Sequence, residues 1–383
     1  MRLLHTADWH LGKRLLGFDR LGETREVLRE IRDIAERERV DAILVAGDLL
    51  DRRLVEPEVL GALLEALEAL GQVAPVVAVT GNHDDPAFWV PLSRFLAPRN
   101  IWMRSRFDDL VELPTADGPL HIACLPWPDP RSIESAIGAA SRVAHGAYAE
   151  SVASLISDYA ERLRQARTDR GGAAVLMGHL MVATAKAGGG ERELTLGDTY
   201  AVQRERLPQD LDYVALGHIH LAQRVPGLHG EGRYCGSPMQ LDFGEAGVDP
   251  RVAIVEIGHE VRVREVPIAA GRRLVKLRGT VDDVAMQAKE HPNAHFWCEI
   301  DLERAIPDLV HVVREVIPTA LKVTPRYAEA ARSSGTSDDI TEAAAPDVLA
   351  QYAWWYEERQ RALDPSQIAA FARSVHETQT PEL

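Results

Sequence analysis

Three short and almost wholly apolar segments near the start of the chain constrain its fold more than any other feature. They span residues 2–7, 41–46 and 76–79, and the stretches between them have the apolar spacing of helices. Strands that are apolar along their whole length are typical of parallel sheets buried on both faces, and their alternation with helices is typical of α/β proteins. The sequence therefore predicts an α/β fold that begins strand–helix–strand–helix–strand.

Polar residues beside a glycine follow each of these strands, and two later apolar strands, at 173–177 and 212–216, end in the same way. In parallel sheets the carboxyl ends of the strands share one edge, where ligands bind. We therefore expect the side chains after the five strands to meet in one site. In chain order the five motifs are Asp8-Trp9-His10-Leu11-Gly12, Gly47-Asp48, Gly81-Asn82-His83-Asp84, Gly178-His179 and Gly217-His218-Ile219-His220.

Seven of these side chains offer metal-binding atoms. A carboxylate has two oxygens, so Asp48 is suited to bridge two ions. Mixed nitrogen and oxygen ligation favours Mn, Fe or Zn over Mg or Ca, which prefer oxygen. Two ions about 3.5–4 Å apart acidify a bridging water and hold the oxygens of a phosphate ester. The two carboxylates, one amide and four imidazoles are Asp8, Asp48, Asn82, His10, His179, His218 and His220.

His83 and Asp84 are not among the candidate metal ligands, so they are candidates for catalytic roles. His83 follows the candidate ligand Asn82, so its imidazole can stabilise the transition state or protonate the leaving oxygen. Asp84 is placed to orient that imidazole. A single histidine is more often a core or surface residue than a ligand, and we interpret His5, inside the first strand, in that way. Five histidines after strand ends marked by glycine favour a site.

The remaining chain predicts a second sheet and two further segments. A short strand at 120–125, a proline-rich bend at 126–130 and a helix at 147–168 precede the strands at 173–177 and 212–216. Short strands with Gly and Pro turns then continue to about residue 268, which predicts a second sheet added edge by edge. Three glycines at 188–190 indicate either a surface loop or a loop over the site.

From residue 271 the pattern changes to strand–helix–strand–helix–strand, which predicts a small separate domain. A small and polar stretch at 331–339 is typical of a linker, and two helices are expected in 346–383. The first of these helices has one apolar face, formed by Val348, Leu349, Tyr352, Trp355 and Tyr356. Two helices cannot bury that aromatic surface alone. It packs either on its own domain or, as we favour, on a partner protein.

Composition limits the class of protein. A chain of 383 residues with 46% hydrophobic and 26% charged residues is expected to form two or three soluble domains. Three separate cysteines, no leader-like start and no membrane-length apolar run predict a cytoplasmic protein without a membrane segment. A net charge of −15 disfavours nucleic acid, but bound metal ions and local clusters such as Lys13-Arg14 and Arg52-Arg53 reverse the sign locally. No phosphate-binding GxxxxGK[ST] loop occurs, so any ATP dependence must come from another chain.

The five motifs, in this order, resemble the calcineurin-like metallophosphoesterase superfamily. The DxHLG form of the first motif and the order of the later segments resemble its SbcD family of bacterial DNA double-strand-break repair nucleases. The resemblance implies a two-sheet αββα sandwich core, a small α/β capping domain and a C-terminal helix-loop-helix. It implies a nuclease domain over 1–270, a DNA-binding capping domain over 271–330, a linker over 331–346 and a helix-loop-helix over 347–383.

The resemblance also implies how the site residues divide. One Mn²⁺ would take Asp8, His10, Asp48 and His220, and the other would take Asp48, Asn82, His179 and His218. Mg²⁺, Fe²⁺ or Zn²⁺ is less expected. His83 would be the catalytic imidazole, supported by Asp84. Archaeal relatives carry a histidine where Asp51 stands here, so the role of that histidine does not transfer to this chain.

For activity and partners, the resemblance implies a Mn-dependent DNA nuclease of repair, recombination and replication. It would act as a 3′→5′ exonuclease on duplex ends and an endonuclease on single strands and hairpins. Residues 347–383 would dock on the ATPase SbcC, and the chain would form a homodimer within a heterotetramer. A phosphatase or cyclic-nucleotide phosphodiesterase with the same metals is the alternative, although it would not require the chain after residue 270. A non-catalytic scaffold is disfavoured because every expected ligand is present.

Overall fold

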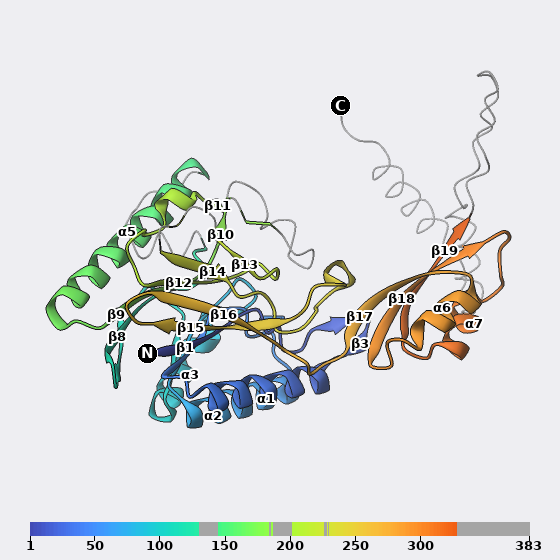
Figure 1. Ribbon diagram of the computed structural model, residues 1–383, viewed down its shortest axis with the longest axis horizontal. Helices are drawn as coiled ribbons and strands as arrows, with labels where there is room; N and C mark the ends of the chain where they lie inside the picture. Colours follow the sequence, from blue (N-terminus) through green and yellow to red (C-terminus); the bar gives the residue numbers. More distant parts are fainter. Residues whose placement is uncertain (130–144, 184, 187–200, 226–227, 229, 328–383) are drawn as a thin grey trace, which may run out of the picture. The chain divides into compact units, whose positions relative to one another are not determined.

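The computed structural model describes residues 1–129, 145–183, 185–186, 201–225, 228 and 230–327. Within these ranges the chain forms two six-stranded sheets and one three-stranded sheet, with helices against them (Figure 1). None of the helices in the described ranges is both long and apolar enough to cross a membrane. The glycines at 188–190, the expected linker and the expected C-terminal helices lie outside the described residues.

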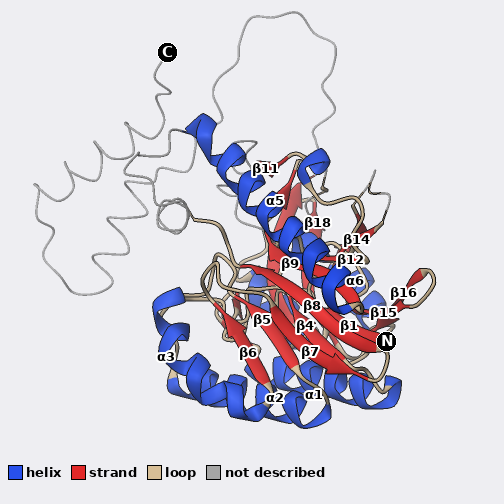
Figure 2. Ribbon diagram, turned by 90° about the vertical axis from the view of Figure 1, so that its left-hand side faces the viewer, coloured by secondary structure: helices blue, strands red, loops and turns tan. Residues whose placement is uncertain are grey.

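The first sheet contains the three strands that the N-terminal sequence predicts. Its order is β16-β15-β1-β4-β5-β6, and β1, β4, β5 and β6 run parallel. Helices α1 and α2 pack on its outer face, and their apolar residues join those of the sheet in one core (Figure 2). The bounds are β1 (Arg2–Thr6), α1 (Leu21–Glu38), β4 (Ala42–Val45), α2 (Pro57–Val73), β5 (Val76–Val79), α3 (Pro86–Leu96), β6 (Ile101–Arg104), β15 (Arg251–Ile257) and β16 (Val261–Pro267).

The second sheet lies face to face with the first. Its order is β13-β14-β12-β9-β8-β7, and α5 covers its outer face (Figure 1). Side chains such as Leu44 and Val77 of the first sheet and Val175 and Ala215 of the second form the core between the sheets. The predicted αββα sandwich is therefore confirmed. The bounds are β7 (Val111–Thr115), β8 (Gly118–Leu125), α5 (His145–Arg170), β9 (Ala173–His179), β12 (Tyr213–Gly217), β13 (Gln223–Arg224) and β14 (Glu231–Tyr234).

One expectation about the second sheet is wrong. We expected the short strands up to residue 268 to add to its edge, but β15 and β16 return to the first sheet, where β15 pairs antiparallel with β1. The residues of β15 explain this position. Ile254 packs with the core under the helices, whereas Val255 packs with the core between the sheets. A strand with apolar side chains on both faces is stable only inside a covered sheet.

Residues 273–327 form a parallel three-stranded sheet with two helices and a hydrophobic core of their own. These elements match the strand–helix alternation expected after residue 271, and the middle strand of the sequence is also the middle strand of the sheet. Thr280 and Asp283 form a capping box that begins α6. The bounds are β17 (Arg273–Gly279), α6 (Val281–Ala288), β18 (Ala294–Leu302), α7 (Leu309–Val316) and β19 (Ala320–Tyr327).

Several short elements complete the described chain. The most relevant to the site is the 3₁₀ turn η5, which follows β14 and has Asp242 as its N-cap. The others are two small strand pairs and two further 3₁₀ turns. Their bounds are β2 (Arg14–Leu15), β3 (Phe18–Asp19), η1 (Ala97–Arg99), β10 (Met181–Val182), β11 (Ala201–Val202), η4 (Arg204–Arg206) and η5 (Phe243–Glu245).

Candidate metal centre

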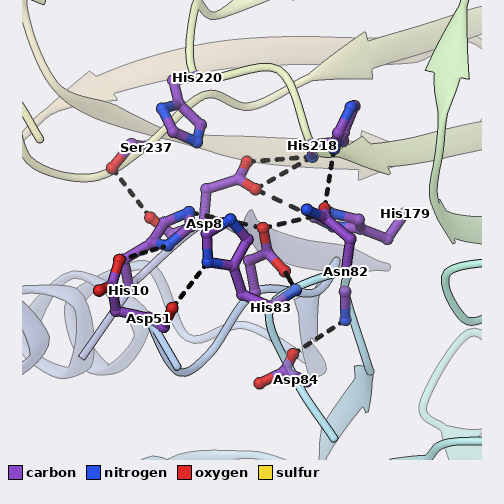
Figure 3. A network of polar contacts seen from close by, with 12 residues as sticks. Asp8, His10, Asp51, Asn82, His83, Asp84, His179, His218, His220 and Ser237 are labelled. Atoms are coloured by element: carbon purple, nitrogen blue, oxygen red, sulfur yellow. Dashed lines mark hydrogen bonds and ion pairs between the residues drawn. The ribbon is translucent and has the colours of Figure 1, made fainter. Parts of the chain in front are cut away.

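The five motifs meet at the carboxyl ends of β1, β4, β5, β9 and β12 (Figure 3). The two facing sheets bring residues from 8 to 220 into one cluster of side chains. All but Asn82 are buried, and Asn82 is partly exposed. The structure thus brings together every residue that the sequence singled out, namely Asp8, His10, Asp48, Asn82, His83, Asp84, His179, His218 and His220.

Donor atoms converge in overlapping groups. In each of three groups, one atom from each residue lies within 4.8 Å of the others: Asp8 with His10 and His220, His10 with Asp48 and His83, and Asp8 with Asp48 and His179. On the other side, Asn82 Oδ1 lies 3.0 Å from His179 Nε2 and 3.0 Å from His218 Nδ1. Groups that share Asp8 and Asp48 can hold two neighbouring cations.

An unsatisfied nitrogen on His10 indicates that the cluster fits metal ions. Among the described residues, His10 Nε2 and His218 Nε2 have no hydrogen-bond partner. An unsatisfied buried polar atom costs about 1–3 kcal/mol. A cation beside Asp48 would satisfy the lone pair of His10 Nε2, and the mixture of carboxylate, amide and imidazole donors suits a borderline divalent ion.

Backbone strain is concentrated at the same positions. Asp8, His10, Asp48 and His218 have positive φ angles of 53°, 46°, 51° and 97°, a region that residues other than glycine rarely occupy. Such residues persist where the surroundings hold them, and they cluster at functional sites. Here the turns brace one another, because Asp8 N donates to Gly47 O at 3.0 Å and His10 N donates to Asp48 O at 3.0 Å.

The glycines of the motifs make room for this cluster. A Cβ at Gly47 would collide with the ring of His179, and a Cβ at Gly81 would collide with the carboxylate of Asp48. At Gly217 it would collide with the carbonyl oxygen of Ala46. Three of the glycines that mark the strand ends, Gly47, Gly81 and Gly217, are therefore required by close approach.

Burial and neighbouring charges shift the pKa values of the groups in the cluster. Burial raises the pKa of Asp8 to about 6, although His179 and His220 oppose the rise. Burial alone would also raise the pKa of Asp48, but His179 and His10 hold it well below its usual value. Burial lowers the pKa of His10 to about 4 and that of His218 to about 3. Burial would also lower the pKa of His179, but the charges of Asp48 and Asp8 raise it to about 9. The neutral rings of His10 and His218 and the ionised carboxylate of Asp48 are forms that bind metal, whereas a cation would have to displace a proton from His179.

Three histidines have Nδ1 fixed by a neighbouring oxygen. His179 Nδ1 lies 2.7 Å from Ala46 O, His83 Nδ1 lies 2.7 Å from Asp51 O, and His220 Nδ1 lies 2.8 Å from a carboxylate oxygen of Glu245. An Nδ1–H that donates to oxygen leaves the lone pair of the neutral ring on Nε2. This second hydrogen bond sets the tautomer and the ring orientation of metal-binding histidines.

Asp84 makes contacts of a different kind from those that we expected. Its carboxylate accepts hydrogen bonds from the backbone N–H groups of Gly81 at 2.9 Å, Leu50 at 3.1 Å and Leu49 at 3.2 Å. The oxygen at His83 Nδ1 is the Asp51 carbonyl instead. Because Asp84 lies in a tight turn, its side chain folds back and joins the loops after β4 and β5. Burial, together with the charge of Asp48, raises the pKa of Asp84 to about 7.

Four further residues contact the cluster and were not assigned to it from the sequence. Glu245 holds His220, and Ser237 Oγ donates to the backbone oxygen of Asp8 at 2.9 Å. The ring of Trp127 lies 5.0 Å from that of His218. Asp51, noted only as a departure from archaeal relatives, lies 3.5 Å from His10 Nδ1. The sequence offered a signal for Trp127, since it is an aromatic residue between two prolines, but it offered none for Glu245 or Ser237.

Comparison with known proteins identifies the family. The model of the calcineurin-like phosphoesterase family matches residues 1–222. The SbcD subunit of the nuclease SbcCD from Bacillus subtilis is 33% identical over 353 residues, which cover 86% of each chain. Its counterpart in Escherichia coli K12 is 27% identical over 342 residues, 85% of this chain and 83% of the other.

A solved dimetal phosphatase from Danio rerio superposes with a TM-score of 0.43 at 13% identity, covering 70% of this chain and 98% of that one. The family match covers more than half of the chain, and the bacterial relatives match it over most of its length. The chain therefore belongs to the calcineurin-like phosphoesterase family and, within it, to the SbcD subunits of SbcCD nucleases.

Proposed function

We propose that this chain hydrolyses DNA phosphodiester bonds with two bound Mn²⁺ ions, as the nuclease subunit of an SbcCD complex. The observation that carries the proposal is the cluster of seven donor side chains at five strand ends, which are buried except for Asn82, with an unpaired nitrogen on His10. Relatives named as SbcCD nuclease subunits support the substrate class.

We assign the ligands as the family resemblance implies. Asp8, His10, Asp48 and His220 would hold one ion, and Asp48, Asn82, His179 and His218 would hold the other. When bound, the two ions would acidify a water molecule and neutralise charge on the attacked phosphate. The overlap of the Asp8 and Asp48 groups supports a shared carboxylate, and the Asn82 contacts with His179 and His218 support the second set.

His83 is our candidate for the catalytic residue. Its Nδ1 faces the carbonyl oxygen of Asp51, so a protonated ring would carry its second proton on Nε2. From that atom it can donate a hydrogen bond to the phosphate or a proton to the leaving oxygen. Asp84 contributes indirectly, because it fixes the turn that carries Asn82 and His83.

Basic residues beside the cluster support a polyanionic substrate despite the net charge of −15. A shallow hollow next to the site is lined by Arg14, Asp51 and Arg52, among others. Lys13 Nζ lies 3.4 Å from Asp51 Oδ1, and Arg53 is exposed without a carboxylate partner in the described part of the chain. Phosphate groups bind mainly to such Lys and Arg side chains.

The finer activities follow the family. We propose 3′→5′ exonuclease action on duplex ends and endonuclease action on single strands and hairpins, controlled by the ATPase SbcC. In this proposal residues 271–330 help to hold DNA and residues 347–383 bind SbcC. Two copies of the chain pair within a heterotetramer. A phosphatase or cyclic-nucleotide phosphodiesterase is the competing function, and the separate α/β unit of residues 273–327 favours the larger substrate.

One substrate panel tests this proposal. Labelled hairpin, duplex and single-stranded DNA are compared with p-nitrophenyl phosphate and a cyclic nucleotide, using the full chain with and without the ATPase partner. Mn²⁺ or a chelator is present in parallel reactions. We expect Mn²⁺-dependent cleavage of DNA that the chelator abolishes. Efficient hydrolysis of the small esters with no cleavage of any DNA would overturn the proposal in favour of a phosphatase.

A further inference from the structure

Glu245 is a buried carboxylate that faces the metal cluster from outside the five motifs. Its Oε1 lies 2.8 Å from His220 Nδ1, and both side chains are almost inaccessible to solvent, at 4% and 5% exposure. Its Oε2 accepts the backbone N–H of Leu241 at 2.7 Å. The carboxylate therefore aims one oxygen at His220 and uses the other to fix its own position.

The segment that carries Glu245 is also attached to residues 273–327. The side chain of Gln240 uses all its polar atoms for this attachment. Its Nε2 donates to the backbone oxygens of Glu245 at 3.0 Å and Val248 at 2.9 Å, and its Oε1 accepts the N–H of Leu274, in β17, at 2.6 Å. One buried amide thus joins the turn that holds Glu245 to the first strand of the three-stranded unit.

Apolar and ionic contacts support the same connection. Phe243, in the turn between Gln240 and Glu245, packs with Leu15 and Leu274 in a small core. The guanidinium of Arg20 donates to the backbone oxygen of Gln240 and also pairs with Glu23 at 2.9 Å. These contacts make the segment 240–245 continuous with the attachment site of β17.

We propose that Glu245 is a positioning residue for His220, and that Gln240 makes this positioning depend on how β17 is seated. The metal centre and residues 273–327 would then be energetically coupled. This inference rests on the proposed function, since it needs His220 to hold a metal ion. The carboxylate keeps the proton of His220 on Nδ1 and the ring in place, and losing such a partner costs about 10–100-fold in metal affinity.

Coupling of this kind is reciprocal. If the seating of β17 strengthens metal binding, then metal binding must stabilise the seating of β17 by the same factor. The Leu274 N–H reports on that seating, because its acceptor is the Gln240 side chain. If Glu245 only stabilised its turn, its substitution would change the free energy of unfolding but would not couple metal affinity to the seating of β17.

The experiment measures Mn²⁺ binding by the full chain and its effect on amide exchange at Leu274. Mn²⁺ affinity is determined calorimetrically for the wild type, Glu245→Gln and Gln240→Met. The matched control is Asp242→Asn, which alters the exposed side chain that accepts the Gly244 N–H at the start of the same turn. Hydrogen exchange of β17 is measured with and without Mn²⁺, and circular dichroism checks the fold of each variant.

We expect Glu245→Gln to bind one of the two ions about 10–100-fold more weakly and Gln240→Met to weaken the same ion, with Asp242→Asn close to wild type. The Mn²⁺ affinity of the double variant Glu245→Gln/Gln240→Met should fall by less than the product of the two single-variant factors, because Gln240 acts on His220 through Glu245. Mn²⁺ should slow exchange at Leu274 in the wild type and have little effect in Glu245→Gln. If Glu245→Gln does not fold, hydrogen exchange at Leu274 in the wild type and the Mn²⁺ affinity of Gln240→Met still test the coupling.

Unchanged affinity in Glu245→Gln, or exchange at Leu274 that ignores Mn²⁺ in the wild type, would overturn the coupling while leaving the metal centre intact. Equal losses in Glu245→Gln and Asp242→Asn would show a general effect of the turn and would also overturn it. A wild-type chain that binds no Mn²⁺ would instead overturn the proposed function, and this inference with it.

Discussion

The Nδ1 atom of His83 lies 2.7 Å from the backbone carbonyl oxygen of Asp51, so a main-chain group orients the imidazole that we propose for catalysis. The two residues belong to loops that follow different strands, β4 and β5. The carboxylate of Asp84 joins these loops through three backbone N–H groups. The orientation of the His83 ring therefore depends on how the two loops pack together. Substitution of His83 should affect catalysis, whereas substitution of Asp84 should also affect the stability of the fold.

His83→Ala should abolish catalysis and leave metal binding intact. A proton donor positioned at the leaving oxygen contributes about 10²–10⁴-fold to the rate, and we expect kcat for DNA cleavage to fall by that factor. Mn²⁺ affinity, measured by calorimetry, should change little. His311→Ala, on the exposed surface of α7, serves as the control. Cleavage near the wild-type rate would remove His83 from the mechanism.

Asp84→Ala should lower the stability of the protein as well as the rate of DNA cleavage. The substitution leaves three buried N–H groups without their acceptor, and each such group costs about 1–3 kcal/mol when it stays dry. We expect the free energy of unfolding, measured in urea on metal-free protein, to fall by about 2–4 kcal/mol. The neighbouring Asp85 accepts a hydrogen bond from Ala87 N at the start of α3, so Asp85→Ala should cost about 0.5–2 kcal/mol. Equal losses would show that Asp84 does not brace the loops.

Most of the site was predictable because of one physical rule. Parallel strands place their carboxyl ends at one edge of a sheet. Once the strands were recognised, the polar residues that follow them were therefore expected to lie close together; these are residues 8, 48, 82, 179 and 218. The apolar runs identified those strands, and the glycines beside them mark close approaches such as that of Gly81 to Asp48.

The groups that orient the imidazoles could not be predicted in this way. The carbonyl oxygens of Ala46 and Asp51 carry no sequence signal, because every residue has a carbonyl group. Glu245 lies in a 3₁₀ turn whose position depends on Gln240 and on β17, and neither contact follows from periodicity. The return of β15 to the first sheet was missed because pairing partners are long-range choices that local pattern does not fix.

Stability should depend on pH through Glu23, which connects α1 with β18. Burial would raise the pKa of Glu23, but hydrogen bonds from His295 and Arg20, with the charge of Arg20, lower it to about 2. A pKa depressed in the folded state stabilises the protein above the unfolded value of 4.5, and this contribution is lost as pH falls from 4.5 towards 2. It amounts to at most about 3 kcal/mol.

Comparison of the wild type with Glu23→Gln isolates this contribution. The difference in the free energy of unfolding should be constant from pH 7 to about pH 5 and should shrink below pH 4.5. Urea titrations at several pH values measure it, and other carboxylates cancel in the difference. A difference that stays constant down to pH 3 would mean that Glu23 has an ordinary pKa.

Removal of residues 347–383 should separate partner binding from cleavage. The apolar face that the sequence predicts for Val348, Leu349, Tyr352, Trp355 and Tyr356 is the proposed docking surface for SbcC, whereas the candidate metal ligands lie within residues 8–220. The truncated chain should keep its Mn²⁺-dependent nuclease activity and lose binding to purified SbcC in a pull-down. Replacing Trp355 and Tyr356 with alanine should have the same effect without shortening the chain. Binding that survives both changes would refute the assignment.

DNA affinity should fall steeply with salt, because each phosphate contact releases counterions and contributes about 0.9 to the slope of log K against log salt concentration. Arg53 is exposed in the loop two residues after Asp51, so Arg53→Gln should reduce that slope by about 1. The control is Arg37→Gln. Arg37 lies in the last turn of α1, which points to the opposite edge of the sheet, and it is 61% exposed. Fluorescence anisotropy with duplex DNA and without divalent ions gives both slopes. A flat salt dependence in the wild type would favour a small phosphate ester as the substrate, and equal slopes for the two variants would place the DNA elsewhere on the protein.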